Sequence, residues 1–477
     1  RGAGQEMVGI LMPPTVAGAL ANYAASLMGK VPVNLNYTLS SEALGSCIEQ
    51  CNIRTVVTSK AFLEQIKLDV PVETILLEDV AKSIGVGSKL AAVLASALLP
   101  VGLLEKFLGS KRRASMDDLA TVIFSSGSTG APKGVMLSHY NVVSNIQQIG
   151  QAFALDRHDR ILGILPFFHS FGFTGTLWLP PLLGLGAVYH PNPVDGRGIG
   201  ELVCEHRATF LLATPTFLQI YIRACTPEQF GSVQFVLAGA EKLPERLAVA
   251  FEDRFGLRPM EGYGTTETSP VVTINTRDFR SAGFRQVGAK RGSIGHPLPG
   301  MVARIVDPDT GVPVALGQAG LLLVKGPNVM QGYLGQAEKT AEVLRDGWYT
   351  TGDIAAMDQD GFLAITDRLS RFSKIGGEMV PHIKVEEQLH ELGSLTDQTF
   401  ALTGVPDERK GERLVVLYQN LDESAVQSIV EKLNGCDLPN IWKPRGDQFF
   451  KVEALPYLGT GKLDLKHVKT LATELSP

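Results

Sequence analysis

The sequence predicts an α/β protein: a large N-terminal domain of α/β layers with a β-rich subdomain, then a small mobile α+β C-terminal domain. Three observations carry this prediction. Short apolar runs alternate with longer helix-like stretches up to about residue 260, short strands punctuated by Gly, Pro and Asp begin near 290, and the pattern changes again after Arg368. A chain of 477 residues also exceeds one ordinary core. We expect the boundary near 368–371, with domains at 1–368 and 369–477.

The first part has the alternation of strands and helices that is typical of an α/β domain. Its strand candidates are short and almost wholly apolar, as in strands buried on both faces of a sheet. The expected strands are 8–12, 121–124, 210–213 and 233–237, and the expected helices are 17–27, 142–153 and 244–255. The later part predicts strands at 303–306, 320–325, 361–366 and 413–419, and a helix at 384–392.

Composition and charge narrow the class of protein. Hydrophobic residues make up 44% and charged residues 19%, which is ordinary for a globular protein, and the formal net charge of -5 argues against a general nucleic-acid binder. We interpret the basic run at 111–113 as a solvated loop. Cys47 and Cys51 lie one helical turn apart without partners at zinc spacing, so we expect the five cysteines to be buried apolar residues in a reducing compartment. The chain starts at Arg1 and enters a strand almost at once, so we expect a piece of a longer polypeptide, truncated at the start of its large domain.

A nearly apolar segment at 90–104 has two interpretations. It is interrupted by Pro100 and flanked by Lys89, Glu105 and Lys106. It falls short of the roughly 20 apolar residues of a spanning helix. We favour a helix buried in the core over a helix on a membrane surface, although an enzyme with a lipid substrate would gain from the second arrangement.

The strongest local signal for chemistry is a stretch of hydroxyl, glycine and lysine residues after an apolar strand. The strand ends at Ser125, and a helix-like stretch begins near Tyr140. Glycines let backbone N–H groups approach an anion, hydroxyls add donors, and a lysine adds a charge. Pro132 precedes the lysine and Gly134 follows it, so the pattern is not the Walker loop, and a P-loop kinase or GTPase is disfavoured. The residues that we expect to hold a polyphosphate are Ser126, Gly127, Ser128, Thr129, Gly130 and Lys133.

Further motifs follow in a fixed order. They are Gly239-Ala-Glu-Lys-Leu243, Glu261-Gly-Tyr-Gly-Thr-Thr-Glu267, Trp348-Tyr-Thr-Thr-Gly-Asp353, Asp367-Arg-Leu-Ser-Arg371, Lys374-Ile-Gly-Gly-Glu-Met379 and Pro456-Tyr-Leu-Gly-Thr-Gly-Lys-Leu463. With the phosphate loop, this series resembles the adenylate-forming superfamily, which includes acyl-CoA synthetases, luciferase and peptide-synthetase adenylation domains. The resemblance covers essentially the whole chain.

The resemblance implies a role for each motif. Tyr263 would lie against the adenine ring, Thr266 would bond the α-phosphate, and Glu267, together with Thr129, would hold Mg²⁺. An aromatic face suits a nucleobase, and carboxylate oxygen is a natural ligand for Mg²⁺. The other implied nucleotide contacts are Gly239, Ala240, Glu241, Glu261, Gly262, Gly264 and Thr265.

The last motifs imply the ribose site, the hinge and the catalytic lysine. Asp353 would accept both ribose hydroxyls, and Arg368 would reach the nucleotide beside the hinge between domains. The family often carries Asp or Lys where this sequence has Ser370, so the hinge residue itself stays open. The loop at 374–379 matches the one that swings in for the second half-reaction, and Lys462 is the expected catalytic lysine.

These roles define a two-step reaction that uses ATP and Mg²⁺. A carboxylate attacks the α-phosphorus of ATP, pyrophosphate leaves, and a thiol then attacks the mixed anhydride. Mg²⁺ on Glu267, Lys133 over the leaving phosphates and Lys462 bridging the reactants would offset the repulsion between two anions. The acid is already ionised at neutral pH, so no general base is needed.

The segment Leu165-Pro-Phe-Phe-His-Ser-Phe-Gly-Phe173 resembles the acid-pocket motif. Peptide-synthetase domains usually carry Asp where this chain has His169, so we predict a plain carboxylic acid, with a purely structural histidine as the alternative. The apolar surroundings favour a long alkyl tail, at about 0.8 kcal/mol per buried methylene. Discrimination of one methylene is only roughly 1–3 kcal/mol, so the sequence does not fix the chain length.

A narrower resemblance concerns the acceptor. The phrases His169-Ser-Phe-Gly, Gly326-Pro-Asn-Val-Met-Gln-Gly-Tyr333 and Phe372-Ser-Lys-Ile-Gly-Gly-Glu-Met-Val380 are similar to the acyl-acyl-carrier-protein synthetase domain of bacterial bifunctional lysophospholipid acyltransferases. This implies transfer to acyl carrier protein, a fused N-terminal acyltransferase, and a cytoplasmic enzyme at the inner face of the membrane. The alternatives are a long-chain fatty-acid–CoA ligase, a degenerate nucleotide-binding regulatory domain, and a membrane-recruited interaction module.

Overall fold

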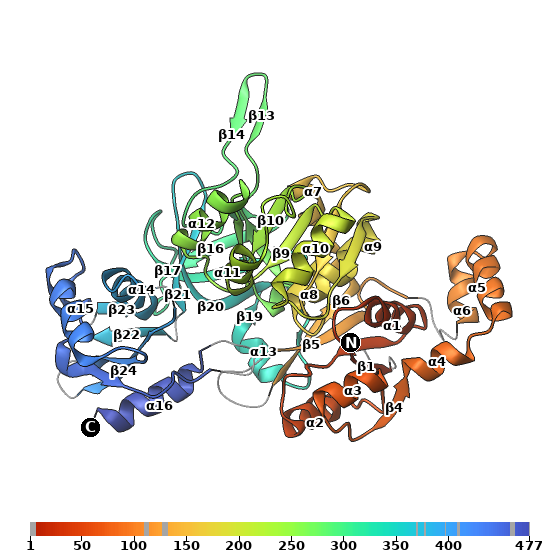
Figure 1. Ribbon diagram of the computed structural model, residues 1–477, viewed down its shortest axis with the longest axis horizontal. Helices are drawn as coiled ribbons and strands as arrows, with labels where there is room; N and C mark the ends of the chain where they lie inside the picture. The colour runs from red at the N-terminus through yellow and green to blue at the C-terminus, as the bar shows by residue number, and fades with distance from the viewer. Residues whose placement is uncertain are drawn as a thin grey trace.

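The computed structural model describes residues 6–108, 114–125, 132–368, 371–375, 378–395, 397–407, 411–457 and 463–476. Figure 1 shows a small N-terminal sheet and a large central body, with a separate C-terminal unit on the far side of that body. The predicted α/β class, with a large N-terminal part and a smaller C-terminal one, is confirmed.

A four-stranded parallel sheet opens the chain, in the order β2-β1-β3-β4. Helices between its strands bury a core of their own, to which Leu119 and Val122 of a later strand also belong. The strands are β1 (Met7–Leu11), β2 (Val31–Asn34), β3 (Thr55–Thr58) and β4 (Glu73–Leu76), and the helices are α1 (Val16–Leu27), α2 (Ser41–Gln50) and α3 (Lys60–Ile66).

Three of the five cysteines are buried, as the sequence predicts. Cys47 and Cys51 lie in the core of this first sheet, where burial raises the pKa of each thiol to about 12. Cys225 is also buried, and Cys436 is partly so. The expectation of burial is wrong for Cys204, which is exposed on an outer helix.

Seven strands make the central sheet, in the order β15-β12-β11-β10-β9-β7-β8. Neighbouring strands from β8 to β11 are parallel. β12 pairs antiparallel with β11, and β15 pairs antiparallel with β12. The predicted fully buried strands β9 and β10 are buried at every position. The strands are β7 (Arg160–Gly163), β8 (Gly186–Tyr189), β9 (Phe210–Ala213), β10 (Phe235–Ala238), β11 (Met260–Gly264), β12 (Val271–Ile274) and β15 (His296–Pro297). The helices of this body are α7 (His139–Phe153), α8 (Ser170–Gly172), the π-helix η1 (Phe173–Trp178), α9 (Leu179–Leu183), α10 (Gly196–His206), α11 (Pro215–Ala224), α12 (Glu245–Phe255) and the 3₁₀ turn η2 (Thr266–Thr268).

The strand before the predicted phosphate loop belongs to a three-stranded sheet, β18-β6-β5. β5 (Leu119–Ser125) pairs antiparallel with β6 (Lys133–Ser138), with Ser125 opposite Lys133, and β18 (Gly332–Tyr333) lies beside β6. The sequence predicts a helix near Tyr140 as the next element, whereas the structure has the strand β6 before that helix. The loop therefore joins two strands of a hairpin, and Lys133 is fixed at the start of a strand.

The predicted β-rich region forms a sheet in the order β16-β17-β20-β19, with β21 beside β20. Two further strands, β13 and β14, make a hairpin that projects at the top of Figure 1. The elements are β13 (Phe279–Ser281), β14 (Phe284–Gln286), β16 (Val302–Val306), β17 (Gly320–Lys325), α13 (Ala337–Val343), β19 (Leu344–Arg345), β20 (Trp348–Met357) and β21 (Leu363–Arg368).

The C-terminal unit has a separate core. Its sheet has the order β23-β22-β25-β24, with β26 parallel to β25. Buried apolar side chains from Ile375 onward cluster only with one another among the described residues, and the predicted boundary near 368–371 lies before them. The elements are β22 (Phe372–Ile375), β23 (Glu378–Pro381), α14 (His382–Leu392), β24 (Phe400–Asp407), β25 (Gly411–Tyr418), α15 (Glu423–Gly435), η4 (Asn440–Trp442), η5 (Gly446–Gln448), β26 (Phe449–Lys451) and α16 (Leu465–Leu475).

The apolar segment at 90–104 is not a core helix, so the favoured interpretation is wrong. It belongs to α5 (Val86–Leu98) and α6 (Val101–Phe107), which follow α4 (Leu77–Ser83) and project from the body in Figure 1. The segment leaves the edge strand β4, beyond the layers that could cover it. No single helix in the described ranges has the length and apolar character to cross a membrane, and only the bent pair α4–α5 passes that test jointly. Large apolar side chains at least half exposed here are Val86, Leu90, Val93, Leu94, Leu98, Val101, Leu103 and Phe107.

Candidate active site

The predicted nucleotide motif at 261–267 covers most of β11 and runs into the 3₁₀ turn η2. β11 ends at the carboxyl edge of the parallel strands, the edge at which open α/β sheets bind ligands. A Cβ at Gly264 would lie 2.0 Å from the Pro270 carbonyl oxygen, so only glycine fits there. The Thr265 N–H donates to Thr268 Oγ1 over 3.1 Å, which closes the turn and fixes Thr266 and Glu267 at its start.

Glu267, Tyr333 and Lys133 meet beside this turn. The Tyr333 hydroxyl donates to Glu267 Oε1 over 2.9 Å, and Lys133 Nζ lies 5.4 Å from the centroid of the Tyr333 ring. Burial and the neighbouring Glu267 carboxylate raise the pKa of Tyr333, so the hydroxyl stays a donor. No described residue donates a hydrogen bond to Glu267 Oε2. This half-buried carboxylate oxygen fits Mg²⁺, which prefers hard oxygen ligands.

Tyr263 and Asp353 are brought together from separate sheets. The Tyr263 hydroxyl donates to Asp353 Oδ2, and the Asp353 side chain is buried. Asp353 lies on β20 directly opposite Arg368 on β21. The structure thus places the predicted adenine and ribose residues next to each other and the Arg368 backbone across from them.

The predicted adenine turn, residues 239–241, follows β10. Ala240 has φ +69°, a left-handed conformation that is uncommon for alanine, and such positions concentrate at functional sites. Glu241 Oε2 accepts a hydrogen bond from Thr216 Oγ1 over 2.8 Å. A Cβ on Gly239 would lie 3.3 Å from the Phe171 ring, and one on Gly262 would lie 3.2 Å from Leu237. Gly239 and Gly262 therefore let the backbone lie close to these apolar side chains.

Glu261 is a half-buried carboxylate beneath this turn. Burial raises its pKa to about 7, although Glu261 Oε1 accepts the Leu243 N–H over 3.1 Å. Lys242, which follows Glu241 in the same motif, forms an ion pair with Glu387 of α14 at 2.6 Å. The turn that is predicted to hold adenine thus contacts the C-terminal unit directly.

The predicted acid motif reaches the nucleotide motif through a hydroxyl pair. Ser170 Oγ donates to Thr266 Oγ1 over 3.4 Å. His169, half-buried, precedes this serine, and its ring centroid lies 4.7 Å from that of Phe168. Ser170 and Phe171 belong to α8, which continues into the π-helix η1, a rare element that is frequent at functional sites.

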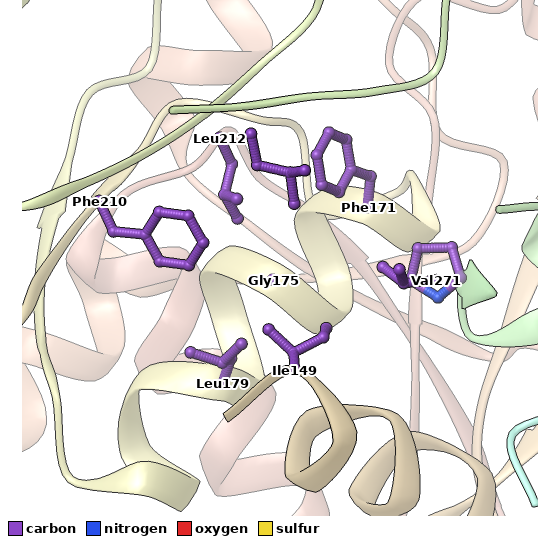
Figure 2. Close-up of a pocket in the computed structure, with 9 residues that line it drawn as sticks. Ile149, Phe171, Gly175, Leu179, Phe210, Leu212 and Val271 are labelled. Carbon is purple, nitrogen blue, oxygen red and sulfur yellow. The ribbon is translucent and has the colours of Figure 1, made fainter. Parts of the chain in front are cut away.

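An apolar cavity lies directly behind Phe171 (Figure 2). Its volume is only about 10 Å³, or room for roughly one water molecule. A long acyl tail therefore needs side chains to move. The lining residues come from α7, α8, η1, α9, the central sheet and the residue before β12, and they are Ile149, Phe171, Gly175, Leu179, Phe210, Leu212, Leu237, Pro270 and Val271.

Some predicted site residues lie outside the described residues. These are Ser126, Gly127, Ser128, Thr129, Gly130 and Lys462, together with the side chains of Arg368, Lys374 and Glu378. Each of them stays a prediction from the sequence.

Two residues lie in the site although the sequence motifs imply no role for them. Tyr333 links Glu267 to Lys133, and Ser170 links the acid motif to Thr266. Each stands inside a phrase that the sequence analysis quoted. The missing signal was the pairing of β18 with β6, which brings Tyr333 opposite Val135, two residues after Lys133.

Comparison with known proteins agrees with this geometry. A family model described as AMP-binding enzyme matches residues 1–334. Feruloyl-CoA synthase of Amycolatopsis sp. is 36% identical over 301 residues, which are 62% of this chain and 58% of that protein. Long-chain-fatty-acid–CoA ligase of Bacillus subtilis is 37% identical over 303 residues, which are 62% of this chain and 51% of that protein. The chain thus spans little more than half the length of these relatives.

A solved structure resembles nearly the whole chain. ATP-bound MatB from Rhodopseudomonas palustris has a TM-score of 0.80 and 25% identity, and the match covers 99% of this chain and 90% of that one. The similarity therefore includes the C-terminal unit, beyond the part that the family model matches.

Proposed function

Because the chain belongs to the AMP-binding enzyme family, we propose that it is an AMP-forming acid–thiol ligase that activates a long-chain fatty acid. The observation that carries this proposal is the contact between the predicted acid motif and the predicted nucleotide motif. Ser170 of the acid motif lies against Thr266, and Glu267, the next residue, accepts a hydrogen bond from Tyr333, whose ring lies near the Lys133 ammonium. A carboxylate held near His169 would therefore lie beside the residues that suit the phosphates of a nucleotide. The names of the relatives favour a ligase over a degenerate nucleotide-binding regulatory domain.

ATP is the proposed nucleotide, and the ATP-bound state of MatB supports this choice. Tyr263 and Asp353 would hold the adenosine, with the buried Asp353 as acceptor for ribose hydroxyls. Lys133, at the start of β6, would balance the charge of the leaving phosphates. Glu267 and Thr129 would hold Mg²⁺, which supplies additional positive charge to the phosphates when bound.

The acid is proposed from the character of its pocket. Every residue that lines the cavity behind Phe171 is apolar or glycine, which suits an alkyl tail. The Bacillus subtilis relative carries the name long-chain-fatty-acid–CoA ligase, which supports the same choice. Ferulate, an aromatic acid, is the second candidate because of the feruloyl-CoA synthase relative.

The acceptor is proposed to be a phosphopantetheine thiol. The phrases around His169, Gly326 and Phe372 favour the thiol of acyl carrier protein, with lysophospholipid reacylation as its use. The names of the two relatives favour CoA. The two acceptors share the same reactive end, so only an assay with both can separate them.

A parallel assay tests the proposal. The chain is incubated with ATP, Mg²⁺ and either palmitate or ferulate, and with holo-carrier protein or CoA, while AMP and thioester are followed. We expect AMP with palmitate, little with ferulate, and a thioester with carrier protein. AMP from ferulate alone would overturn the fatty acid, a thioester with CoA alone would overturn the carrier protein, and no AMP with either acid would overturn the ligase.

Lys462 is proposed to act only in the first step. Lys462→Ala should abolish formation of acyl-adenylate and largely spare thioester formation from supplied acyl-adenylate. Lys466→Ala, an exposed lysine on α16, is the matched control and should leave both steps unchanged. Equal loss of both steps in Lys462→Ala would contradict this role.

A further inference from the structure

The helices α5 and α6 carry their large apolar side chains on the outside. Val86, Leu90, Val93 and Leu94 recur at the spacing of one helical face, and all are at least half exposed. Among the residues that the structure describes, the half-buried positions of the pair are Ala95, Leu99, Leu104 and Leu108. A helix packed on a globular core turns its large apolar stripe inward, so this arrangement is the reverse of the usual one.

The charges around this surface have one dominant sign. Lys89 and Lys106 are exposed, one on each helix. From Lys82 to Lys106 the sequence contains three basic residues and one acidic residue, a net charge of +2 in a chain whose formal net charge is -5. Such a combination of apolar and basic side chains complements an anionic surface with an apolar layer beneath it.

Length and direction limit how this segment could meet such a surface. α5 has 13 residues, and at about 1.5 Å per residue a helix of that length falls well short of the roughly 30 Å of a bilayer core. The axes of α4 and α5 differ by 89°. Neither α5 alone nor the bent α4–α5 unit therefore suits a crossing of the bilayer, and the segment fits a position along its surface.

We propose that α5 and α6 form a binding surface for a bilayer that contains anionic lipids. The apolar stripe of α5, with Leu98 and Phe107, enters the acyl layer, and Lys89 and Lys106 contact the headgroups. A fluid bilayer can cover a projecting helix pair without a matching shape, whereas a protein partner would need a complementary groove. The surface would also bring the chain to the phase in which long-chain acids dissolve, a benefit that depends on the proposed function, although the surface itself does not.

Vesicle flotation tests the proposal on this chain as it is. The vesicles are phosphatidylcholine with or without phosphatidylglycerol, and the variants are Leu98→Ser/Phe107→Ser and Lys89→Glu/Lys106→Glu. The matched controls are Val312→Ser/Leu316→Ser, which changes two apolar side chains of similar exposure elsewhere, and Lys60→Glu/Lys339→Glu. All these side chains are largely exposed, so the variants should fold, and circular dichroism checks this.

The proposal predicts flotation with the vesicles that contain phosphatidylglycerol, reduced by added salt. Both α5–α6 variants should lower the bound fraction at least about tenfold, and both controls should leave it unchanged. Absence of flotation by the wild-type chain would overturn the proposal. So would equal loss in variants and controls, or sedimentation of the wild type as a dimer that Leu98→Ser/Phe107→Ser dissociates while flotation persists.

Discussion

Two apolar segments of similar composition have opposite surroundings. The segment at 171–179 lies between the central sheet and α7, and Phe173, Leu177 and Leu179 are fully buried. The segment at 90–104 leaves the edge of the small N-terminal sheet, and Leu98 is 75% exposed. The apolar composition of a segment determines how much free energy the segment would gain by leaving water. Its neighbours in the fold decide whether protein, ligand or another surface supplies the cover.

The largest expected effect compares one substitution in the two segments. Leu177→Ala removes a fully buried side chain and should lower the free energy of unfolding by about 2–5 kcal/mol. Leu98→Ala removes an exposed side chain of the same kind, and its effect should stay within about 0.5 kcal/mol. Urea unfolding followed by circular dichroism measures both. A similar loss in the two variants would mean that α5 is packed in solution.

Two carboxylates, Glu261 in the central sheet and Glu78 on α4, should have opposite pKa shifts. Burial raises the pKa of Glu261 from the usual 4.5 to about 7, whereas hydrogen bonds from Ser59 and from the Lys60 N–H lower the pKa of Glu78, on α4, to about 2. Folding therefore favours protonated Glu261. The stability that this supplies is full below pH 4.5 and is lost as pH rises through about 7.

Glu261→Gln removes this dependence on pH. The variant should gain stability relative to the wild type between about pH 5 and about pH 8, by up to roughly 3 kcal/mol. Thermal unfolding at both pH values measures the difference. A difference that does not change with pH would contradict the raised pKa, and NMR titration of the Glu261 carboxyl would locate the error.

A smaller effect concerns the glycines of the two segments. A Cβ at Gly175 would lie 2.6 Å from Leu212 Cδ1, whereas a Cβ at Gly102 on α6 meets no atom within 4 Å. Gly175→Val should lower kcat/KM for palmitate by roughly 10–200-fold and should affect a short acid such as butyrate less, because it blocks the cavity behind Phe171. Gly102→Val should leave both acids unchanged in the AMP assay. Equal losses for palmitate and butyrate would place the alkyl tail elsewhere.

The sequence predicted the elements whose pattern is local. Strand 210–213 and strand 320–325 match β9 and β17 to the residue, because four consecutive apolar residues form all of the first and the centre of the second. The motifs predict Lys133, Glu267, Tyr263 and Asp353 as site residues. The fold places Lys133 and Glu267 on either side of Tyr333, and it brings Tyr263 into direct contact with Asp353.

The features that the sequence did not predict depend on pairing between segments that are distant in the chain. β6 is a short strand whose partner β5 lies across the phosphate loop, and Tyr333 reaches Glu267 only because β18 pairs with β6. The exposure of α5 depends on where β4 lies in its sheet, at the edge. No pattern within residues 86–108 indicates that β4 lies at the edge of its sheet. The apolar composition of the segment therefore favoured a helix buried in the core.

Palmitate-dependent exchange of pyrophosphate into ATP tests the central claim most directly. The account predicts exchange by the wild-type chain, unchanged exchange by Glu338→Gln, an exposed carboxylate on α13, and a loss of about 100- to 1000-fold in Glu267→Gln with unchanged thermal stability. Exchange by Glu267→Gln at the level of Glu338→Gln would contradict the assignment of the site, and no exchange by the wild type with palmitate would contradict adenylation of a fatty acid.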